Sequence, residues 1–241
     1  MPRFLFITYE IAAWDNTTNH KIIGDFFLYE LVSPKKVPPE HGVTDPTEYF
    51  QGEVLQSYIR SKSMMHIQEQ IALRTLEFSG VKPPALILDL GMGPGFSSVP
   101  LFLKGFTIIG IDLIWDMLVE YPISELNPIA GNMLHLFFRE NTFDYIFSVS
   151  AFQWTLTLNG RFQRDALKSM AQEVYKILKS RGVCVFQLYE TSQTRLDEIY
   201  SIFTESGFSG KYIIDNPQST KKRKTYLYLQ KIEQRFCEGC S

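Results

Sequence analysis

The sequence has little cysteine, no long apolar run and almost no net charge. Cys184, Cys237 and Cys240 are too few for a disulfide framework, which favours a reducing, intracellular compartment. Cys237 and Cys240 have metal-ligand spacing but lack a second pair, so no metal site is predicted. Acidic residues interrupt the apolar N-terminal stretch, which argues against both a signal peptide and a membrane span of roughly 18 residues. We therefore expect a soluble protein of the cytoplasm, or of the nucleus in a eukaryote, with no membrane partner.

The charge is unevenly distributed along the chain. The 241 residues carry 24 basic and 26 acidic side chains, and 45% of them are apolar, which predicts a globular domain with a real core. Residues 211–241 hold 7 of the basic and 3 of the acidic side chains, so this segment has a net charge of +4 and the remainder −6. The C-terminal segment is thus the part of the chain expected to meet an anionic partner.

Strand and helix patterns alternate from residue 85 onward, which is the rhythm of a parallel sheet in an α/β fold. The last two strands have only a short basic connection between them, so they must pair antiparallel or lie apart. The predicted strands cover residues 85–90, 106–112, 128–131, 143–150, 183–189, 211–215 and 225–230, and the predicted helices cover 63–78, 96–105, 114–121, 164–180 and 194–207.

The N-terminal part has a different character. Residues 1–36 form two apolar, aromatic-rich runs that fit a β-hairpin or a strand and a short helix, and a proline-rich boundary follows them. We therefore divide the chain into an extension (1–36), a main domain (37–232) and a tail (233–241). The extension is either a genuine element or the product of an upstream start-codon error.

A glycine-rich loop lies between a buried strand and a predicted helix, in the sequence DLGMGPGFS. Gly91, Gly93 and Gly95 let the backbone turn sharply and approach a ligand closely. Asp112 ends the next strand, 21 residues after Gly91, where its carboxylate can accept hydrogen bonds from ribose hydroxyls. The loop and this acid together predict a nucleoside-bearing cofactor.

The spacing of the glycines narrows the choice of cofactor. It is neither the G-x-G-x-x-G of dinucleotide sites nor a P-loop, which favours an adenosine cofactor without phosphate. S-adenosylmethionine is such a molecule, and Asp89 is placed to organise the loop amides or to meet the cofactor's ammonium group. A dehydrogenase with a nicotinamide dinucleotide remains an alternative.

Further candidates follow the later strands, at the edge where open α/β sheets bind ligands. Asn132 could bond the adenine amino group, and Met133 could pack on the adenine ring or simply fill the core. Gln153 and Trp154 could line a substrate pocket or be structural.

These motifs together resemble class I S-adenosylmethionine-dependent methyltransferases, through LILDLGMGPGFSS, IIGIDLIWDML and FDYIFSVSAFQW. A narrower resemblance is to the small-subunit ribosomal RNA (guanine-N7) methyltransferase family. It depends on the PPE at Pro38–Glu40, the helix SMMHIQEQIALRTLEF, the SAFQW at Ser150–Trp154 and the ending GFSGKYIIDNPQSTKKRKTYLYL, and it covers residues 37–230.

The resemblance implies a Rossmann-like fold with a seven-stranded, mostly parallel sheet and an antiparallel last strand. It also implies S-adenosylmethionine as cofactor and guanine N7 of small-subunit ribosomal RNA as the methyl acceptor, in rRNA processing and ribosome biogenesis. The cofactor-binding residues it implies are Asp89, Gly91, Gly93, Gly95, Asp112, Leu113, Asn132, Met133 and Ser148, and those facing the substrate are Phe152, Gln153 and Trp154.

The expected chemistry needs no catalytic residue, because guanine N7 has a free lone pair at neutral pH and the enzyme has only to position it. Lys221, Lys222, Arg223 and Lys224 lie between two predicted strands, where they could meet RNA phosphates or form a solvated hairpin. A methyltransferase of a small molecule or of another RNA, and a cofactor-binding ribosome-assembly factor, remain alternatives.

The resemblance also implies a partner. Relatives work with a small zinc-binding activator protein that adds a strand to the edge of the sheet. The apolar stretch Pro128–Phe138, with LHLFF inside it, could meet such a partner or belong to the core.

Overall fold

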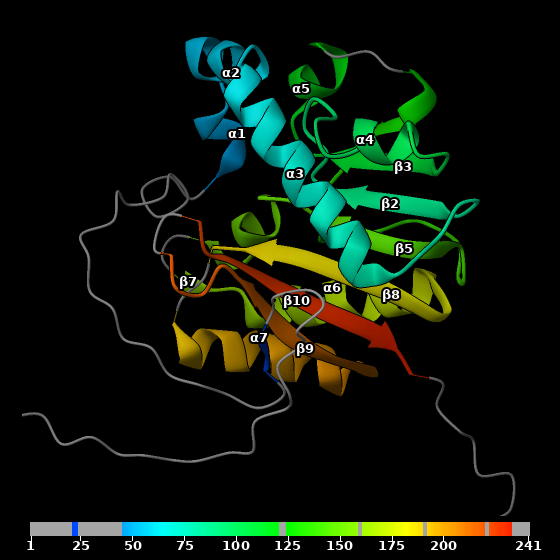
Figure 1. The fold of residues 1–241 in the computed structure, drawn as a ribbon. Helices are drawn as coiled ribbons and strands as arrows, with labels where there is room; N and C mark the ends of the chain where they lie inside the picture. The colour runs from blue at the N-terminus through cyan, green and yellow to red at the C-terminus, as the bar shows by residue number, and fades with distance from the viewer. Residues whose placement is uncertain are drawn as a thin grey trace, which may run out of the picture.

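Eight strands form one mixed sheet with helices on both faces (Figure 1). The computed structural model describes residues 21–23, 45–120, 124–158, 161–189, 192–219 and 222–232. The strand order is β1-β9-β10-β8-β5-β2-β3-β4, and a separate hairpin pairs β6 with β7. The strands are β1 (Lys21–Ile23), β2 (Leu86–Leu90), β3 (Thr107–Asp112), β4 (Pro128–Ala130), β5 (Phe143–Ser148), β6 (Thr157–Leu158), β7 (Arg161–Phe162), β8 (Leu178–Leu188), β9 (Phe208–Asp215) and β10 (Lys224–Lys231).

The directions of the strands confirm the predicted fold class. Strands β4, β3, β2, β5 and β8 are parallel, and β10 runs antiparallel to both β8 and β9. Strand β1 adds an eighth, antiparallel strand on the outside of β9. The division of the chain stays a prediction: β1 is all that is described of residues 1–36, and residues 233–241 lie outside the described ranges.

Two groups of helices cover the two faces of the sheet, and each buries an apolar cluster against it. Helix α3 crosses one face together with α4 and α5, while α6 and α7 cover the other (Figure 1). Apolar side chains at helical spacing make this packing possible, as in α6, where Leu167, Met170, Ala171 and Val174 are all buried. The helices are α1 (Pro46–Tyr49), α2 (Gly52–Ile59), α3 (Lys62–Ser79), α4 (Val99–Phe102), α5 (Trp115–Glu120), α6 (Arg164–Ile177) and α7 (Gln193–Glu205).

Some helix boundaries differ from the prediction. Helix α3 exceeds its predicted range of 63–78 by one residue at each end: it begins after Ser61, whose side chain accepts a hydrogen bond from the backbone of Met64, and ends at left-handed Gly80. Helix α6 ends at Ile177 rather than at residue 180. The amides of Asn141 and Thr142 bond the carbonyls of its last turn, and the chain then continues directly into β8.

The carboxyl edge of the sheet brings the expected site residues together. Strands β2, β3 and β5 end there, and in Figure 1 the arrowheads of β2 and β8 point to the side where α1 and α2 lie. Because β10 is reversed, it begins at this same edge, where Thr225 pairs with Leu188. None of the helices within the described ranges is both long and apolar enough to cross a membrane.

Candidate cofactor and substrate site

A cavity opens at the carboxyl edge between the sheet and helices α1 and α2. The empty space inside it, counted to include its open mouth, is about 510 Å³. Most of the lining is apolar, and it includes the carboxylate of Asp112. The cavity is lined by Pro46, Phe50, Tyr58, Gly91, Gly93, Asp112, Leu113, Ile114, Met117, Met133, Val149, Ser150, Ala151 and Trp154.

The glycine loop forms one wall of this cavity through Gly91 and Gly93. Gly91 has φ +81°, and a Cβ added there would overlap the Cβ of Ala151. Its amide donates to the carbonyl of Ile111 at 2.8 Å, which ties the loop to β3. The absence of a side chain at Gly91 therefore allows Ala151 to pack closely against the loop. Gly95 also has positive φ but lies outside the lining, against Leu126.

Asp112 lies at the end of β3 and is held by two backbone amides. Its Oδ2 accepts from Gly93 at 2.7 Å and its Oδ1 accepts from Ile114 at 2.8 Å. Burial raises the pKa of this carboxyl, and the backbone hydrogen bonds oppose that shift. The acid thus has two functions: it faces the cavity and fixes the conformation of the glycine loop.

Asp89 lies beneath the loop rather than in the cavity lining. It is fully buried, and its Oδ2 accepts from the hydroxyls of Ser97 and Ser98 at 2.6 and 2.7 Å. Its Oδ1 has no hydrogen-bond partner within the described residues. Burial raises the pKa of Asp89 to about 7, although the two hydroxyls lower it. Its observed partners are hydroxyls rather than loop amides, so both of its predicted roles stay predictions.

The raised pKa of Asp89 predicts a pH-dependent stability. Between about pH 4 and pH 7 the folded protein holds the proton more tightly than the unfolded chain does, so the free energy of unfolding should fall as the pH rises through this window. Since one pKa unit corresponds to about 1.4 kcal/mol, we expect a change of a few kcal/mol. Urea unfolding at several pH values should show this slope in the wild type and a much weaker one in Asp89→Asn, which keeps an acceptor for the two serines. An equal slope in both proteins would contradict the assignment.

The remaining predicted cofactor residues divide into two groups. Leu113 and Met133 line the cavity. Asn132 and Ser148 do not: the side-chain oxygen of Asn132 accepts from the amide of Leu134 at 2.9 Å and shapes a turn, and the Ser148 hydroxyl donates to the carbonyl of Leu90 at 2.7 Å and joins two strands. Their predicted contact with the cofactor has no support in these side-chain contacts.

Of the three predicted substrate residues, one lines the cavity and two do not. Trp154 lines the cavity. Phe152 lies in the core, with its ring stacked on Phe186 at 5.0 Å between centroids, so it cannot reach a substrate. Gln153 is buried, and its amide nitrogen donates to the carbonyl of Ser150 at 2.6 Å. These two residues follow Ala151 in a short 3₁₀ helix that turns them inward.

Helices α1 and α2 supply an aromatic side of the cavity that the sequence analysis missed. The ring of Phe50 lies 5.9 Å from that of Trp154 and 5.2 Å from that of Tyr58. The Tyr58 hydroxyl accepts from the side-chain nitrogen of Gln68, and burial, together with nearby negative charge, raises its pKa far above the usual range, so it stays neutral. The one feature of the sequence that could have indicated this aromatic side is the pair Tyr49 and Phe50, directly after the proline-rich segment.

The basic run lies at the same edge of the sheet as the cavity. Lys222 and Arg223 precede β10 and Lys224 begins it, while Lys221 lies outside the described residues. The Lys224 ammonium is 6.0 Å from the centre of the Tyr189 ring, and burial lowers the pKa of this lysine. Since the Tyr189 hydroxyl bonds the hydroxyl of Ser150 at 2.9 Å, the run is connected to the cavity wall.

Comparison with known proteins agrees with this geometry. Residues 88–186 match the family model described as a methyltransferase domain. The fold resembles the PH0226 protein of Pyrococcus horikoshii (TM-score 0.58, 18% identity, 77% of this chain and 99% of that one). It also resembles a structure of the Haloferax volcanii Trm112 methyltransferase activator in complex with a putative methyltransferase (TM-score 0.60, 16% identity, 80% of this chain and 99% of that one). The fold and the site define a methyltransferase that uses S-adenosylmethionine.

Curated relatives identify the family. The chain is 32% identical to the 18S rRNA (guanine-N(7))-methyltransferase of Bos taurus, over 76% of this chain and 68% of that protein. It is 31% identical to the protein of the same name from Mus musculus, over 79% and 70%, and 29% identical to its counterpart in Schizosaccharomyces pombe, over 80% and 74%. The chain belongs to the 18S rRNA (guanine-N7)-methyltransferase family.

The cavity fits the cofactor of this class. S-adenosylmethionine carries an adenosine, a cationic sulfonium and an amino-acid end. The carboxylate of Asp112 is suited to such a cation, and Met133 and Leu113 offer apolar contact for a flat ring. The predicted roles of the individual residues stay predictions.

Proposed function

We propose that this protein transfers a methyl group to N7 of a guanine in small-subunit ribosomal RNA. The observation that carries the proposal is the position of the basic run beside the cofactor cavity, connected to it through Tyr189 and Ser150. RNA phosphates could bind the run while one base enters the cavity, where Phe50 and Trp154 offer aromatic faces. Membership of the family supports the same substrate.

In this mechanism the protein contributes position and exclusion of water. When bound, the cofactor supplies an electrophilic methyl group, and the N7 lone pair needs no base to attack it. The two ionisable side chains of the described lining agree with this: Tyr58 stays neutral, and both oxygens of Asp112 are engaged by backbone amides. Gly91 and Gly93 form the wall against which the cofactor lies, and the aromatic side of the cavity keeps water out.

The direct test is mass-spectrometric mapping of modified guanines in small-subunit ribosomal RNA from cells with and without this protein. The proposal expects one N7-methylguanine that disappears with the protein and returns when it is restored. An unchanged map, with methyl transfer found only to a small molecule or to another RNA, would overturn it.

The basic run provides a second prediction. The triple variant Lys222→Ala, Arg223→Ala and Lys224→Ala should bind a ribosomal RNA fragment about tenfold or more weakly, because it loses three contacts with phosphates. The slope of log affinity against log salt should become shallower by up to about 2, at roughly 0.7 for each phosphate of a single strand. Filter binding at several salt concentrations measures both quantities.

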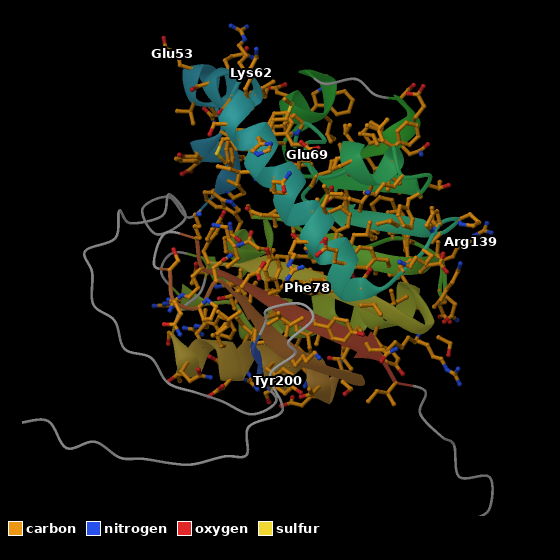
Figure 2. The ribbon with its side chains drawn as sticks, viewed as in Figure 1. Glu53, Lys62, Glu69, Phe78, Arg139 and Tyr200 are labelled. Carbon is orange, nitrogen blue, oxygen red and sulfur yellow. The ribbon has the colours of Figure 1, made fainter. Side chains whose placement is uncertain are left out.

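The opposite edge of the sheet offers a matched control. Lys82, Lys104 and Arg139 are exposed and precede the strands β2, β3 and β5, and Figure 2 shows Arg139 at the far end of the sheet from Glu53 of α2. Changing these three residues to alanine removes the same charges. RNA binding should then stay within about threefold of the wild type. An equal loss in both triple variants would indicate attraction by net charge alone.

A small activator protein is part of the proposal. Strand β4 ends the sheet at the edge opposite β1, and no further strand pairs with it among the described residues. In the stretch after it, Leu134, Leu136 and Phe138 pack against the core, while Phe137 is 63% exposed. Trp115 of the adjacent helix α5 is exposed as well. An added strand could pair with β4 and cover these rings, and the Haloferax volcanii complex supports a partner of this kind; that the partner binds zinc follows from the family resemblance.

A further inference from the structure

Ser150 has a strained backbone in the wall of the cavity. Its φ is +57°, a left-handed conformation that serine rarely adopts and that glycine adopts freely. The residue follows buried Val149 and precedes Ala151, whose Cβ closes against Gly91. Because such a conformation costs on the order of 1 kcal/mol or more, it persists only where the surroundings hold it.

Two buried glutamines hold Ser150 in its left-handed conformation. The Oε1 of Gln187 accepts from both the amide and the hydroxyl of Ser150, at 3.0 and 2.9 Å. The amide nitrogen of Gln187 donates to the carbonyl of Leu188, so Oε1 is the atom directed at Ser150. From the other side, Gln153 donates to the Ser150 carbonyl at 2.6 Å. Gln187 is 0% exposed and Gln153 is 7% exposed, so water does not compete for these bonds.

The hydrogen bonds to Gln187 also fix the direction of the hydrogen bond between the hydroxyls of Ser150 and Tyr189. Because the Ser150 hydroxyl gives its proton to Gln187, its oxygen must accept from the hydroxyl of Tyr189. Tyr189 is 40% exposed and lies next to the Lys224 ammonium. The two glutamines thus control the cavity wall at Ala151 and, through Ser150, the orientation of an aromatic ring between the cavity and the basic run.

We propose that Gln187 and Gln153 are positioning residues for methyl transfer. They lock Ser150 in its left-handed conformation, and this sets the place of the target base between the cavity wall and Tyr189. The inference rests on the proposed function, because it concerns how the RNA base is presented. Neither glutamine lines the cavity, so their effect on the reaction is indirect.

Gln187→Met tests the inference, since methionine has a similar volume but no acceptor for the amide of Ser150. The rate of methyl transfer to RNA should fall about tenfold or more, as expected for misplaced reactants, while the Kd for S-adenosylmethionine changes less than about threefold. Adding Ser150→Gly should restore the rate to that of the Ser150→Gly single variant, because glycine adopts this φ without being held. Ser150→Thr, which keeps the hydroxyl but is β-branched, should be slow even if Gln187→Met folds poorly.

Thr75→Val is the control. Thr75 is fully buried on α3, and its hydroxyl bonds a carbonyl of its own helix away from the cavity, so its loss should affect stability but not the rate of transfer. Wild-type rates in Gln187→Met, or no recovery with Ser150→Gly, would overturn the inference. If the wild type transfers no methyl group to RNA, the proposed function fails by itself. The inference is then decided by hydrogen exchange at the Ser150 amide, which should be slow in the wild type and faster in Gln187→Met; equal rates would overturn it.

Discussion

Replacing Gly91 with alanine is expected to weaken S-adenosylmethionine binding by about 100-fold or more. A Cβ at this position would overlap the side chain of Ala151, and φ +81° is unfavourable for alanine in addition. The glycine loop and the turn after β5 would have to move apart, and this would change the shape of the cavity that they line. Isothermal titration calorimetry with S-adenosylmethionine measures the effect.

Gly80→Ala separates steric overlap from backbone strain. Gly80 also has positive φ, +66°, but a Cβ there would have no atom within 4 Å. This variant should lose roughly 1 kcal/mol of stability and keep its affinity for the cofactor. If both variants bind S-adenosylmethionine as the wild type does, the cavity beside Gly91 is not the cofactor site.

Asp112→Asn is expected to weaken cofactor binding by a similar factor, although the two side chains have almost the same shape. Both carboxylate oxygens accept from backbone amides, so an amide nitrogen would face the N–H of either Gly93 or Ile114. The cavity would also lose the negative charge that favours a cationic ligand. Calorimetry should show about a 100-fold loss of affinity, and thermal unfolding should show a lower Tm because the glycine loop has lost its anchor.

Asp116→Asn is the matched control for this variant. Asp116 lies four residues further along the chain, exposed in the first turn of α5 and outside the cavity lining. The substitution removes the same charge from the same side of the sheet. The affinity for S-adenosylmethionine should therefore change less than about threefold. Equal losses in the two variants would mean that Asp112 acts only through the net charge of the protein.

The sheet and the glycine loop could be predicted because local patterns determine them. Continuous apolar runs predict β2 and β5, and the turns at Gly91 and Gly93 need residues that tolerate positive φ. Asp112 could be predicted from its place at the end of the next strand. Each of these signals lies within a short stretch of sequence, and the parallel order of the strands then brings the strand ends together.

The aromatic side of the cavity could not be predicted in the same way. Phe50 and Tyr58 precede the first parallel strand by many residues and reach the cavity only because α3 packs across the sheet and places α1 and α2 over its edge. The direction in which individual side chains point could not be predicted from the sequence either. Ser148 points between two strands while Ser150, two residues later, faces the cavity, because the strand ends and the backbone turns left-handed at Ser150.

The reversal of β10 has a consequence for how this chain could recognise a large polyanion. In an all-parallel sheet, the residues before the last strand would emerge at the amino edge, far from the cofactor. Here the hairpin between β9 and β10 returns the chain to the carboxyl edge, so Lys222, Arg223 and Lys224 lie on the reactive side. Under the proposed function, a topological inversion of one strand replaces a separate RNA-binding module, and the spacing between phosphate anchor and methyl donor is set by the rigid sheet rather than by a linker.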